Sequence, residues 1–316
     1  MTNAGLITST SNSHNSAKKM FVVVARHGER WDYIQRDAGH NWIATAARPW
    51  DPPLSPNGLK QATRLGEHLS QTLQEMNLPP ISAAYSSPFL RCRQTACQAV
   101  EALNKQKSAA ANDGNAVKVK VELGLSESLN DNWYRSWALP GSDGTWGFVP
   151  PEEEKQSGNS TRRTLSAFTE QELHPDAQRP VQEILNWKDV NHEQSSPNLG
   201  TWQDLDYESS TEISKPFALK PSLMTETRSE QKERMLQVIQ NKAQSAETIL
   251  LVSHGGPVTH LYEKLCGNNW SVHGECTYCC YSIYECEVPD KSKWNPILVN
   301  ESKYLQDLWS DATSNI

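Results

Sequence analysis

The sequence contains no long apolar segment. Among its 316 residues no run of 18 apolar residues occurs, whereas a membrane-spanning helix needs about 20. The first 19 residues are mostly polar and lack the apolar core of a secretory signal peptide. We therefore expect a cytoplasmic protein without a membrane partner, and organelle targeting stays open.

Positive charge is also scarce. The chain has 30 Lys and Arg residues against 37 Asp and Glu residues, a net charge of -7, so we expect no nucleic-acid partner. Any anion site must be a local group of arginines. The apolar fraction of 37% is below the roughly 45–50% of an average globular chain, which predicts long polar loops around an ordinary core.

Paired cysteine motifs are missing as well. The seven cysteines are an odd number, and without a secretory signal they are expected to be reduced thiols. Cys276, Cys279, Cys280 and Cys286 suggest a zinc site, but the chain has no second Cys-x-x-Cys and no His-x-x-x-His. Because the surrounding segment is aromatic and strand-prone, we expect buried strand cysteines, no metal and no cofactor.

The apolar residues that are present follow strand-like and helix-like patterns in turn. Residues 20–25 are typical of a buried parallel strand, and Ser55 is the N-cap of a predicted helix over 55–76. The same patterns predict strand 81–85, a helix from Ser87 to Leu103, a loop over 105–116, strand 117–121, helix 226–244, strand 248–252, a helix through Leu261 and strand 277–285. This alternation predicts an α/β fold with a mostly parallel sheet sandwiched by helices.

The middle of the chain breaks this alternation. Between about residues 130 and 225, Trp, Pro, Ser and Glu dominate, and only a short helix over 180–187 is expected. We interpret this segment as a long irregular insertion that forms a lid or cover. We expect a disordered tail at 1–18 and a single domain over 19–310.

Unusual polar residues follow three of the predicted strands. Arg26, His27 and Arg30 come after the first strand, Arg91 lies in the helix after the second, and His254 follows the fourth. The carboxyl ends of parallel strands meet at one edge of a sheet, where ligands bind. Guanidinium groups bind phosphate oxygens there. The first amides of the helix that begins at Ser87-Pro88 are also expected to face the phosphate.

Histidine can attack phosphorus through a neutral ring nitrogen, which is well populated at neutral pH. Nearby arginines lower the pKa of such a histidine and stabilise the charge of the phosphoryl group in transfer, with no need for a metal ion. The sequence therefore predicts a phosphate-binding pocket with a histidine nucleophile.

These motifs resemble the histidine phosphatase superfamily, whose fold is called phosphoglycerate mutase-like. Its RHG signature is matched by residues 26–28, its S-P-x-x-R-x-x-x-T-A helix by residues 87–96, and its second HG by residues 254–255. The resemblance covers residues 20–130 and 226–290. It implies the fold, the phosphohistidine mechanism and the roles of the matching residues.

On those positions the resemblance implies that His27 is phosphorylated, that Arg26 and Arg91 bind phosphate, and that His254 is a second pocket histidine with catalytic and phosphate-binding roles. Arg30 would add another guanidinium, or would pair with Asp32 or Glu29. Each of these residues is present in the sequence, so the resemblance implies an active enzyme.

The proton donor for the leaving group is usually a glutamate after the third strand in this family. The run Gly124-Leu125-Ser126-Glu127 is similar to that segment, which makes Glu127 the expected general acid. Glu122 and Glu29 remain rivals. A general acid at neutral pH needs a raised pKa.

Within the superfamily, the RHGER, SPFLRCRQTA and GLSE runs look most like the branch of Sts-type protein phosphatases, insect ecdysteroid-phosphate phosphatases and plant relatives. Mutases of the superfamily usually carry RHGxSxxN, whereas residues 29–32 here are Glu-Arg-Trp-Asp. We therefore expect a phosphatase acting on a phosphorylated small molecule or a phosphoprotein. The alternatives are an inactive phosphate- or phosphopeptide-binding adaptor and a phosphoglycerate-mutase-like phosphotransferase.

Aromatic residues crowd the segment after the nucleophile. Trp31, Tyr33, Trp42 and Trp50 lie within 24 residues of His27. They form either an aromatic wall for the leaving group or a cover that holds a long loop on the sheet edge. The sequence leaves both readings open.

Overall fold

The computed structural model describes residues 18–110, 116–156, 163–188, 199–211, 226–242, 248–288 and 293–308. The expected tail at 1–18 lies outside the described residues except for Lys18, which begins the first strand. Within the described ranges, none of the helices combines the length and the apolar character that crossing a membrane requires.

Six strands form one sheet in the order β3-β2-β4-β1-β5-β6. The first four are parallel and the last two are antiparallel to them. Their bounds are β1 Lys18–Arg26, β2 Ile81–Ser86, β3 Val119–Val121, β4 Thr248–Ser253, β5 Tyr281–Val288 and β6 Trp294–Glu301. The fold is therefore the expected mostly parallel α/β sheet flanked by helices.

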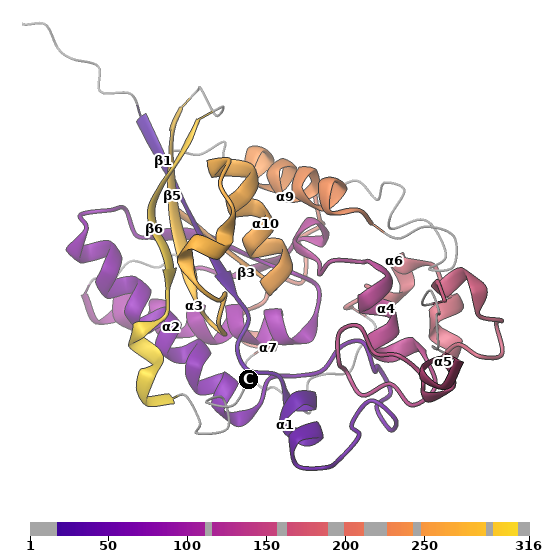
Figure 1. Cartoon of the computed structure of the whole chain (residues 1–316). Helices are drawn as coiled ribbons and strands as arrows, with labels where there is room; N and C mark the ends of the chain where they lie inside the picture. The colour runs from indigo at the N-terminus through magenta and orange to yellow at the C-terminus, as the bar shows by residue number, and fades with distance from the viewer. Residues whose placement is uncertain are drawn as a thin grey trace, which may run out of the picture.

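Helices cover both faces of the sheet (Figure 1). Alternate side chains of a strand point to opposite faces, so Val23 and Ala25 of β1 pack under α2 (Pro56–Glu75) and α3 (Leu90–Ala110). Met20, Val22 and Val24 pack on the other face with α9 (Arg228–Lys242) and α10 (Gly255–Cys266). As expected, Ser55 is the N-cap of α2, because its side chain accepts a hydrogen bond from Gly58 N.

Several boundaries differ from the sequence-based expectations; the helix expected from Ser87, for example, begins at Leu90. Helix α3 continues to Ala110, where a loop was expected from residue 105. The last expected strand, 277–285, begins only at Tyr281 and is followed by β6, which was not predicted. Strand β6 contains Pro296, and proline is tolerated there because β6 is at the edge of the sheet.

The middle segment forms short helical turns around a third hydrophobic cluster. Trp133, Tyr134 and Trp137 form the centre of this cluster, and Trp50 and Phe89 from the main fold pack against them. The remaining helices are α1 Trp31–Asp37, η1 Leu123–Leu125, α4 Asp131–Ala138, α5 Pro151–Gln156, η2 Leu165–Ala167, η3 Pro175–Gln178, α6 Val181–Ile184, α7 Leu199–Trp202, η5 Trp270–His273 and η6 Lys303–Leu308.

Candidate active site

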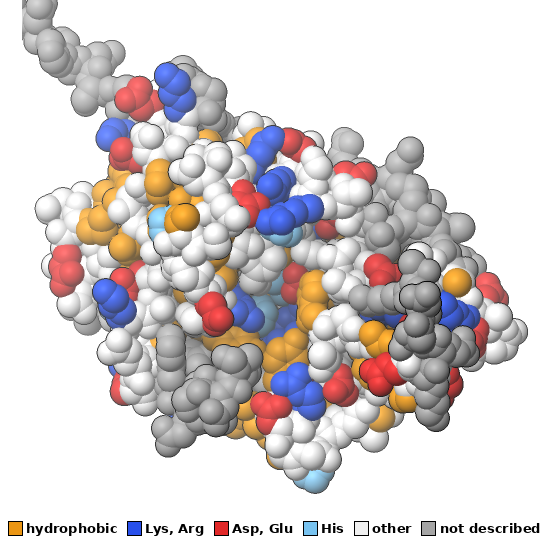
Figure 2. All heavy atoms as spheres, viewed as in Figure 1, with side chains coloured by type: hydrophobic (Ala, Val, Ile, Leu, Met, Phe, Trp, Pro, Cys, Tyr) orange, Lys and Arg blue, Asp and Glu red, His pale blue; other side chains and the backbone are white. Residues whose placement is uncertain are grey.

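The pairing of β1 with β4 brings the two expected site histidines together. Arg26 and Ser253, the last residues of these strands, are paired in register, and His27 N donates a hydrogen bond to Ser253 O at 2.9 Å. The rings of His27 and His254 consequently lie edge to face with their centroids 5.3 Å apart. Figure 2 shows a hollow in this face of the molecule with Lys or Arg and His side chains at its floor.

His27 is buried and held in one tautomer. Its Nδ1 lies 2.7 Å from Gly28 O, and because a carbonyl oxygen only accepts, the proton is on Nδ1 and the lone pair on Nε2. Burial, followed by the charges of Arg91 and Arg26, lowers the pKa of His27 well below its usual value. The ring is therefore neutral and its Nε2 is available as a nucleophile.

The turn at the nucleophile depends on glycine. A Cβ on Gly28 would lie 2.7 Å from the backbone oxygen of Gly58 in α2, so a side chain there would push the helix away from the end of β1. Gly28 N also donates to Thr95 Oγ1 of α3 at 3.0 Å. The RHG motif thus fixes the nucleophile against two helices.

Two of the expected phosphate-binding arginines have buried donors without partners. The Arg91 side chain is 2% exposed, and its Nε and Nη1 have no hydrogen-bond partner among the described residues, like Nε of Arg26. Arg26 also stacks over the Tyr278 ring at 4.3 Å and donates to Cys276 O. Buried donors without partners are costly unless a ligand satisfies them, which is what an anion site requires.

Arg30 is held differently from these two. Its Nε and Nη2 donate to the two Asp32 oxygens at 3.0 and 2.6 Å, and its Nη1 donates to Tyr33 Oη at 3.0 Å. The pairing with Asp32 considered from the sequence is present. The positive charge of Arg30 still acts on the site, since it contributes to the lowered pKa of His27.

His254 is likewise oriented by its neighbours. Arg91 Nη2 lies 3.1 Å from Nδ1, and because guanidinium only donates, Nδ1 accepts and Nε2 donates to Ser87 Oγ at 2.8 Å. Burial and then Arg91 lower its pKa well below the usual value. His254 therefore acts as a neutral side chain that fixes Arg91. Ser87 is a contact that the sequence did not predict.

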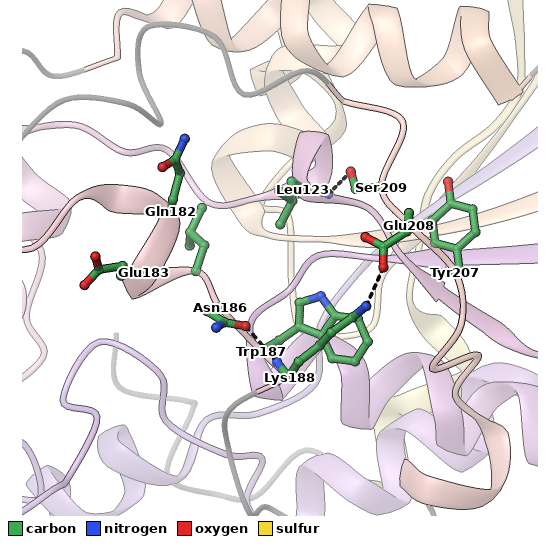
Figure 3. Close-up of a pocket in the computed structure, with 10 residues that line it drawn as sticks. Leu123, Gln182, Glu183, Asn186, Trp187, Lys188, Tyr207, Glu208 and Ser209 are labelled. Atoms are coloured by element: carbon green, nitrogen blue, oxygen red, sulfur yellow. Dashed lines mark hydrogen bonds and ion pairs between the residues drawn. The ribbon is translucent and has the colours of Figure 1, made fainter.

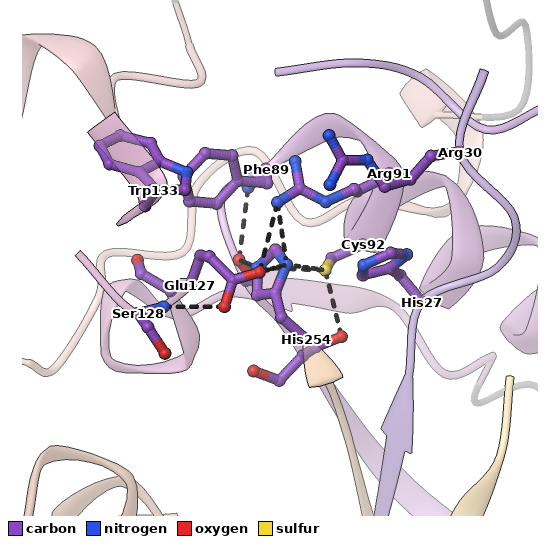
Figure 4. A network of polar contacts seen from close by, with 12 residues as sticks. His27, Arg30, Phe89, Arg91, Cys92, Glu127, Ser128, Trp133 and His254 are labelled. Atoms are coloured by element: carbon purple, nitrogen blue, oxygen red, sulfur yellow. Dashed lines mark hydrogen bonds and ion pairs between the residues drawn. The ribbon is translucent and has the colours of Figure 1, made fainter. Parts of the chain in front are cut away.

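Glu127 faces the two site residues Arg91 and His254 (Figure 4). Its Oε2 lies 3.8 Å from Arg91 Nη2 and 3.4 Å from His254 Nδ1, and its Oε1 accepts from Ser128 N at 2.8 Å. Burial raises the pKa of Glu127 although Arg91 opposes the change. This carboxyl group therefore holds a proton more readily than an exposed one, as a general acid must.

The two rival glutamates have their oxygens engaged elsewhere. Glu122 accepts hydrogen bonds from Tyr207, Ser209, Ser210, Thr211 and Lys242 side chains or amides. These partners outweigh burial and lower its pKa to about 2. Glu29 accepts from Ser55 Oγ at 2.5 Å and from Asn57 Nδ2 at 3.3 Å. The geometry favours Glu127 as the proton donor.

The first amide of α3 does not have the phosphate-binding role that was expected of the helix start. The amide of Leu90, the first residue of α3, donates to Asp51 Oδ1 at 2.6 Å, so a carboxylate of the protein already uses it. Cys92 was also missed by the sequence reasoning, and its Sγ lies 3.4 Å from His254 Nε2. Burial raises the pKa of Cys92, so this thiol is not a competing nucleophile.

A cavity of about 480 Å³ borders the site at Arg26. Its aromatic lining consists of Tyr33, Trp146 and Tyr278. Trp50 instead packs in the third cluster and donates from Nε1 to Ile184 O at 3.2 Å. Of the crowded aromatic residues, Tyr33 therefore lines the cavity, whereas Trp50 belongs to the core.

A second cavity, of about 350 Å³, lies elsewhere (Figure 3). Its lining includes Trp187, Tyr207 and an ion pair between Lys188 and Glu208. His27 and Arg91 do not line this cavity, so it is separate from the site that contains them.

The cysteines do not converge on a single point. Cys279 packs in the cluster on one face of the sheet and Cys286 in the cluster on the other. Cys276 Sγ and Cys280 Sγ lie 3.3 Å apart. Within the described ranges, no group of three or more His, Cys, Asp or Glu side chains is arranged to hold a metal ion.

Residues 22–114 match the family model described as histidine phosphatase superfamily (branch 1). Over these residues the match supports the resemblance to the histidine phosphatase superfamily. The matched segment contains Arg26, His27 and Arg91 but not Glu127 or His254. No curated protein sequence matches the chain.

Solved structures with this fold include an ecdysone phosphate phosphatase from Bombyx mori in complex with tungstate, with a TM-score of 0.50, 16% identity and coverage of 90% of this chain and 94% of that chain. At this identity the similarity shows the fold alone. A phosphoglycerate mutase from Bacillus anthracis has a TM-score of 0.47, 15% identity and coverage of 92% and 97%. A mycobacterial glucosyl-3-phosphoglycerate phosphatase has a TM-score of 0.43, 16% identity and coverage of 90% and 100%.

Proposed function

We propose that this protein is a histidine phosphatase that hydrolyses phosphate monoesters without a metal ion, through a phosphohistidine on His27. The observation that carries the proposal is the neutral His27, with the lone pair on Nε2, beside the unpartnered donors of Arg26 and Arg91. Such donors suit the equatorial oxygens of a phosphoryl group in transfer.

In the first step, His27 Nε2 attacks phosphorus, so that an N–P bond forms while the bond from phosphorus to the leaving oxygen breaks. Arg26 and Arg91 donate to the phosphoryl oxygens. The Glu127 carboxyl group gives its proton to the leaving oxygen. The products of this step are an alcohol and a phosphorylated His27.

In the second step, the Glu127 carboxylate takes a proton from water as the water oxygen attacks phosphorus. The N–P bond breaks, its electrons return to His27 Nε2, and inorganic phosphate is released. Glu127 is then protonated again. His254 keeps Arg91 in place throughout, and Arg30 adds positive charge near the phosphate.

The segment over residues 130–225 is proposed to cover this site within a single domain over 19–310. Phe89 supports this placement, since its ring lies 5.1 Å from the His254 ring and 5.8 Å from the Trp133 ring of the third cluster. We also propose that the protein belongs to the branch that carries RHGER, with a phosphorylated small molecule or a phosphoprotein as substrate.

The test is hydrolysis of p-nitrophenyl phosphate in EDTA by the wild type, by His27→Ala and by His40→Ala, in which an exposed histidine of the same segment is removed. We expect activity in the wild type and in His40→Ala, and loss of activity in His27→Ala. Equal rates in all three proteins would overturn the nucleophile assignment.

Two other functions are outcomes of the same experiment. Binding of phosphate without hydrolysis of any monoester would indicate an inactive adaptor. Transfer of the phosphoryl group to a second substrate, dependent on priming by a bisphosphate, would indicate a mutase. The phosphatase is favoured because Glu127 lies 3.4 Å from His254 Nδ1 and burial raises its pKa, which supports a role as the leaving-group acid.

A further inference from the structure

The proposed acid Glu127 is placed by the backbone of its loop. Among the described residues, its carboxylate accepts one hydrogen bond, from the neighbouring Ser128 N. The contacts to Arg91 and His254 are longer, at 3.8 and 3.4 Å. A carboxylate held so loosely is aimed mainly by the path of residues 123–129.

That path is fixed by Arg234, which projects from α9. Its Nη1 donates to Gly124 O at 2.7 Å and to Ser126 O at 3.1 Å. Its Nη2 donates to the backbone oxygen of Glu127 itself at 3.2 Å. One guanidinium therefore binds three carbonyl groups of the loop, the last of them on the proposed acid.

The remaining donors of Arg234 hold it in place. Nε and Nη2 donate to the two oxygens of Glu226, each at 2.7 Å, so that all five N–H groups of the guanidinium are used. Both residues are 6% exposed. Glu226 N also donates to Leu129 O at 2.9 Å, which ties the end of the loop to the same ion pair.

Other contacts fasten the loop on either side of Glu127. Gln231, one turn before Arg234, donates from Nε2 to Ser128 Oγ at 2.6 Å. A Cβ on Gly124 would lie 2.3 Å from the Val238 side chain, so the loop packs directly on α9. Residues of α9 therefore bind four residues of the loop that carries the proposed acid, Gly124, Ser126, Glu127 and Ser128.

We propose that Arg234 is a positioning residue for Glu127, which acts by fixing the backbone from which the acid reaches the leaving oxygen. The inference rests on the proposed function. A displacement of about 1 Å in a catalytic group can cost on the order of a hundredfold in rate. Lysine cannot replace the planar fork of Arg234, because its ammonium group does not bind a carboxylate and three carbonyls in one plane.

The dependence of the rate on the leaving group distinguishes this positioning role from a purely structural one. Proton donation matters most for an alkyl leaving group and least for p-nitrophenolate, which departs readily as an anion. Loss of a positioning residue for the acid should therefore depend on the leaving group. General destabilisation lowers the amount of active protein and reduces both activities by the same factor.

The experiment compares kcat/KM for phenethyl phosphate and p-nitrophenyl phosphate in the wild type, Arg234→Met, Arg234→Lys and Glu127→Gln. The matched control is Arg228→Met, which removes an arginine of the same helix whose side chain is 60% exposed and pairs with Glu263. Circular dichroism at the assay temperature establishes the folded fraction, and Arg234→Lys is the variant for comparison if Arg234→Met does not fold.

We expect the Arg234 variants to lose about tenfold to a hundredfold on phenethyl phosphate and less than about threefold on p-nitrophenyl phosphate, with Arg228→Met unchanged. Equal losses on the two substrates, or no loss, would overturn the positioning role while the phosphatase activity stands. If the loss of kcat/KM depended on the leaving group in Arg234→Lys but not in Glu127→Gln, the proton donor would be a residue other than Glu127, and the positioning role for Glu127 would be overturned. A wild type inactive on both substrates would overturn the proposed function and this inference together.

Discussion

Two buried glutamates on either side of η1 have opposite electrostatic environments. Glu122 is surrounded by hydroxyl, amide and ammonium donors that lower its pKa to about 2, whereas Glu127 accepts one hydrogen bond and has a raised pKa because of burial. They differ in the donors that the neighbouring segments supply. Burial therefore raises the pKa of a carboxyl group only where few donors offset it, which is the environment that the proposed acid requires.

The arginines show the same contrast. Arg234 uses all five of its N–H groups within the protein, whereas Arg91, equally buried, leaves Nε and Nη1 without partners among the described residues. Arg234 therefore stabilises the folded chain. Arg91 leaves two buried donors unsatisfied at a cost in stability, and the proposed phosphate ligand would satisfy them.

Among the changes that test these two comparisons, the largest effect is expected from Arg91→Met. Loss of two donors to the phosphoryl group should lower kcat/KM for p-nitrophenyl phosphate by about a hundredfold to a thousandfold. Thermal denaturation should show at most a small loss of stability, since removal of a buried charge with two unpartnered donors offsets the loss of the hydrogen bond to His254. If Arg91→Met unfolded at a much lower temperature but kept its activity per folded molecule, Arg91 would be a stabilising residue like Arg234 and not a phosphate ligand.

The next effect is expected from Glu127→Gln. Without the proton donor, kcat/KM for an alkyl phosphate should fall by about a hundredfold or more, with a smaller loss for p-nitrophenyl phosphate. In the wild type, rate should decline as pH rises through the raised pKa of Glu127. Measured pH profiles would contradict the assignment if Glu127→Gln kept the same alkaline limb.

A smaller effect on activity and a larger one on stability are expected from Glu122→Gln. The folded pKa of about 2 lies below the ordinary 4.5, so the stabilisation is present above about pH 4.5 and is lost as pH falls toward 2. The difference corresponds to about 3 kcal/mol at neutral pH. Urea denaturation at pH 7 and pH 3 measures it.

In that experiment the wild type should lose stability between the two pH values, and Glu122→Gln should lose less. Activity of the folded variant should stay within about threefold of the wild type, since the Glu122 carboxylate binds the segment around Tyr207 and Thr211 and pairs with Lys242 of α9. If Glu122→Gln were as stable as the wild type but as inactive as Glu127→Gln, Glu122 rather than Glu127 would be the proton donor.

The sequence predicted the parts of the site that depend on strand ends. The apolar runs that end in His27 and His254 predicted two buried strands, and parallel pairing then brought the histidines together. Strand β6 was missed because Pro296 and its half-exposed residues give no clear alternation. Local pattern identifies buried strands better than edge strands.

The contacts that complete the site could not be predicted in this way. Asp51 accepts from the first amide of α3, and Arg234 donates to the backbone oxygen of Glu127. Both residues belong to segments that are distant in sequence from the groups they bind. Their charges resemble those of ordinary surface residues until the fold buries them. Similarly, no local pattern shows that Glu122 is surrounded by donors and that Glu127 is not; only the resemblance of residues 124–127 to a family segment favoured Glu127.

The most direct test of the account is to trap the phosphorylated intermediate. The wild type is mixed with a phosphate monoester labelled in the phosphoryl group, quenched in alkali, and compared with His27→Asn. We predict a label on His27 that is stable in alkali, labile in acid and absent from His27→Asn. An acid-stable label, or one that persists in His27→Asn, would contradict the central claim that His27 carries the phosphoryl group.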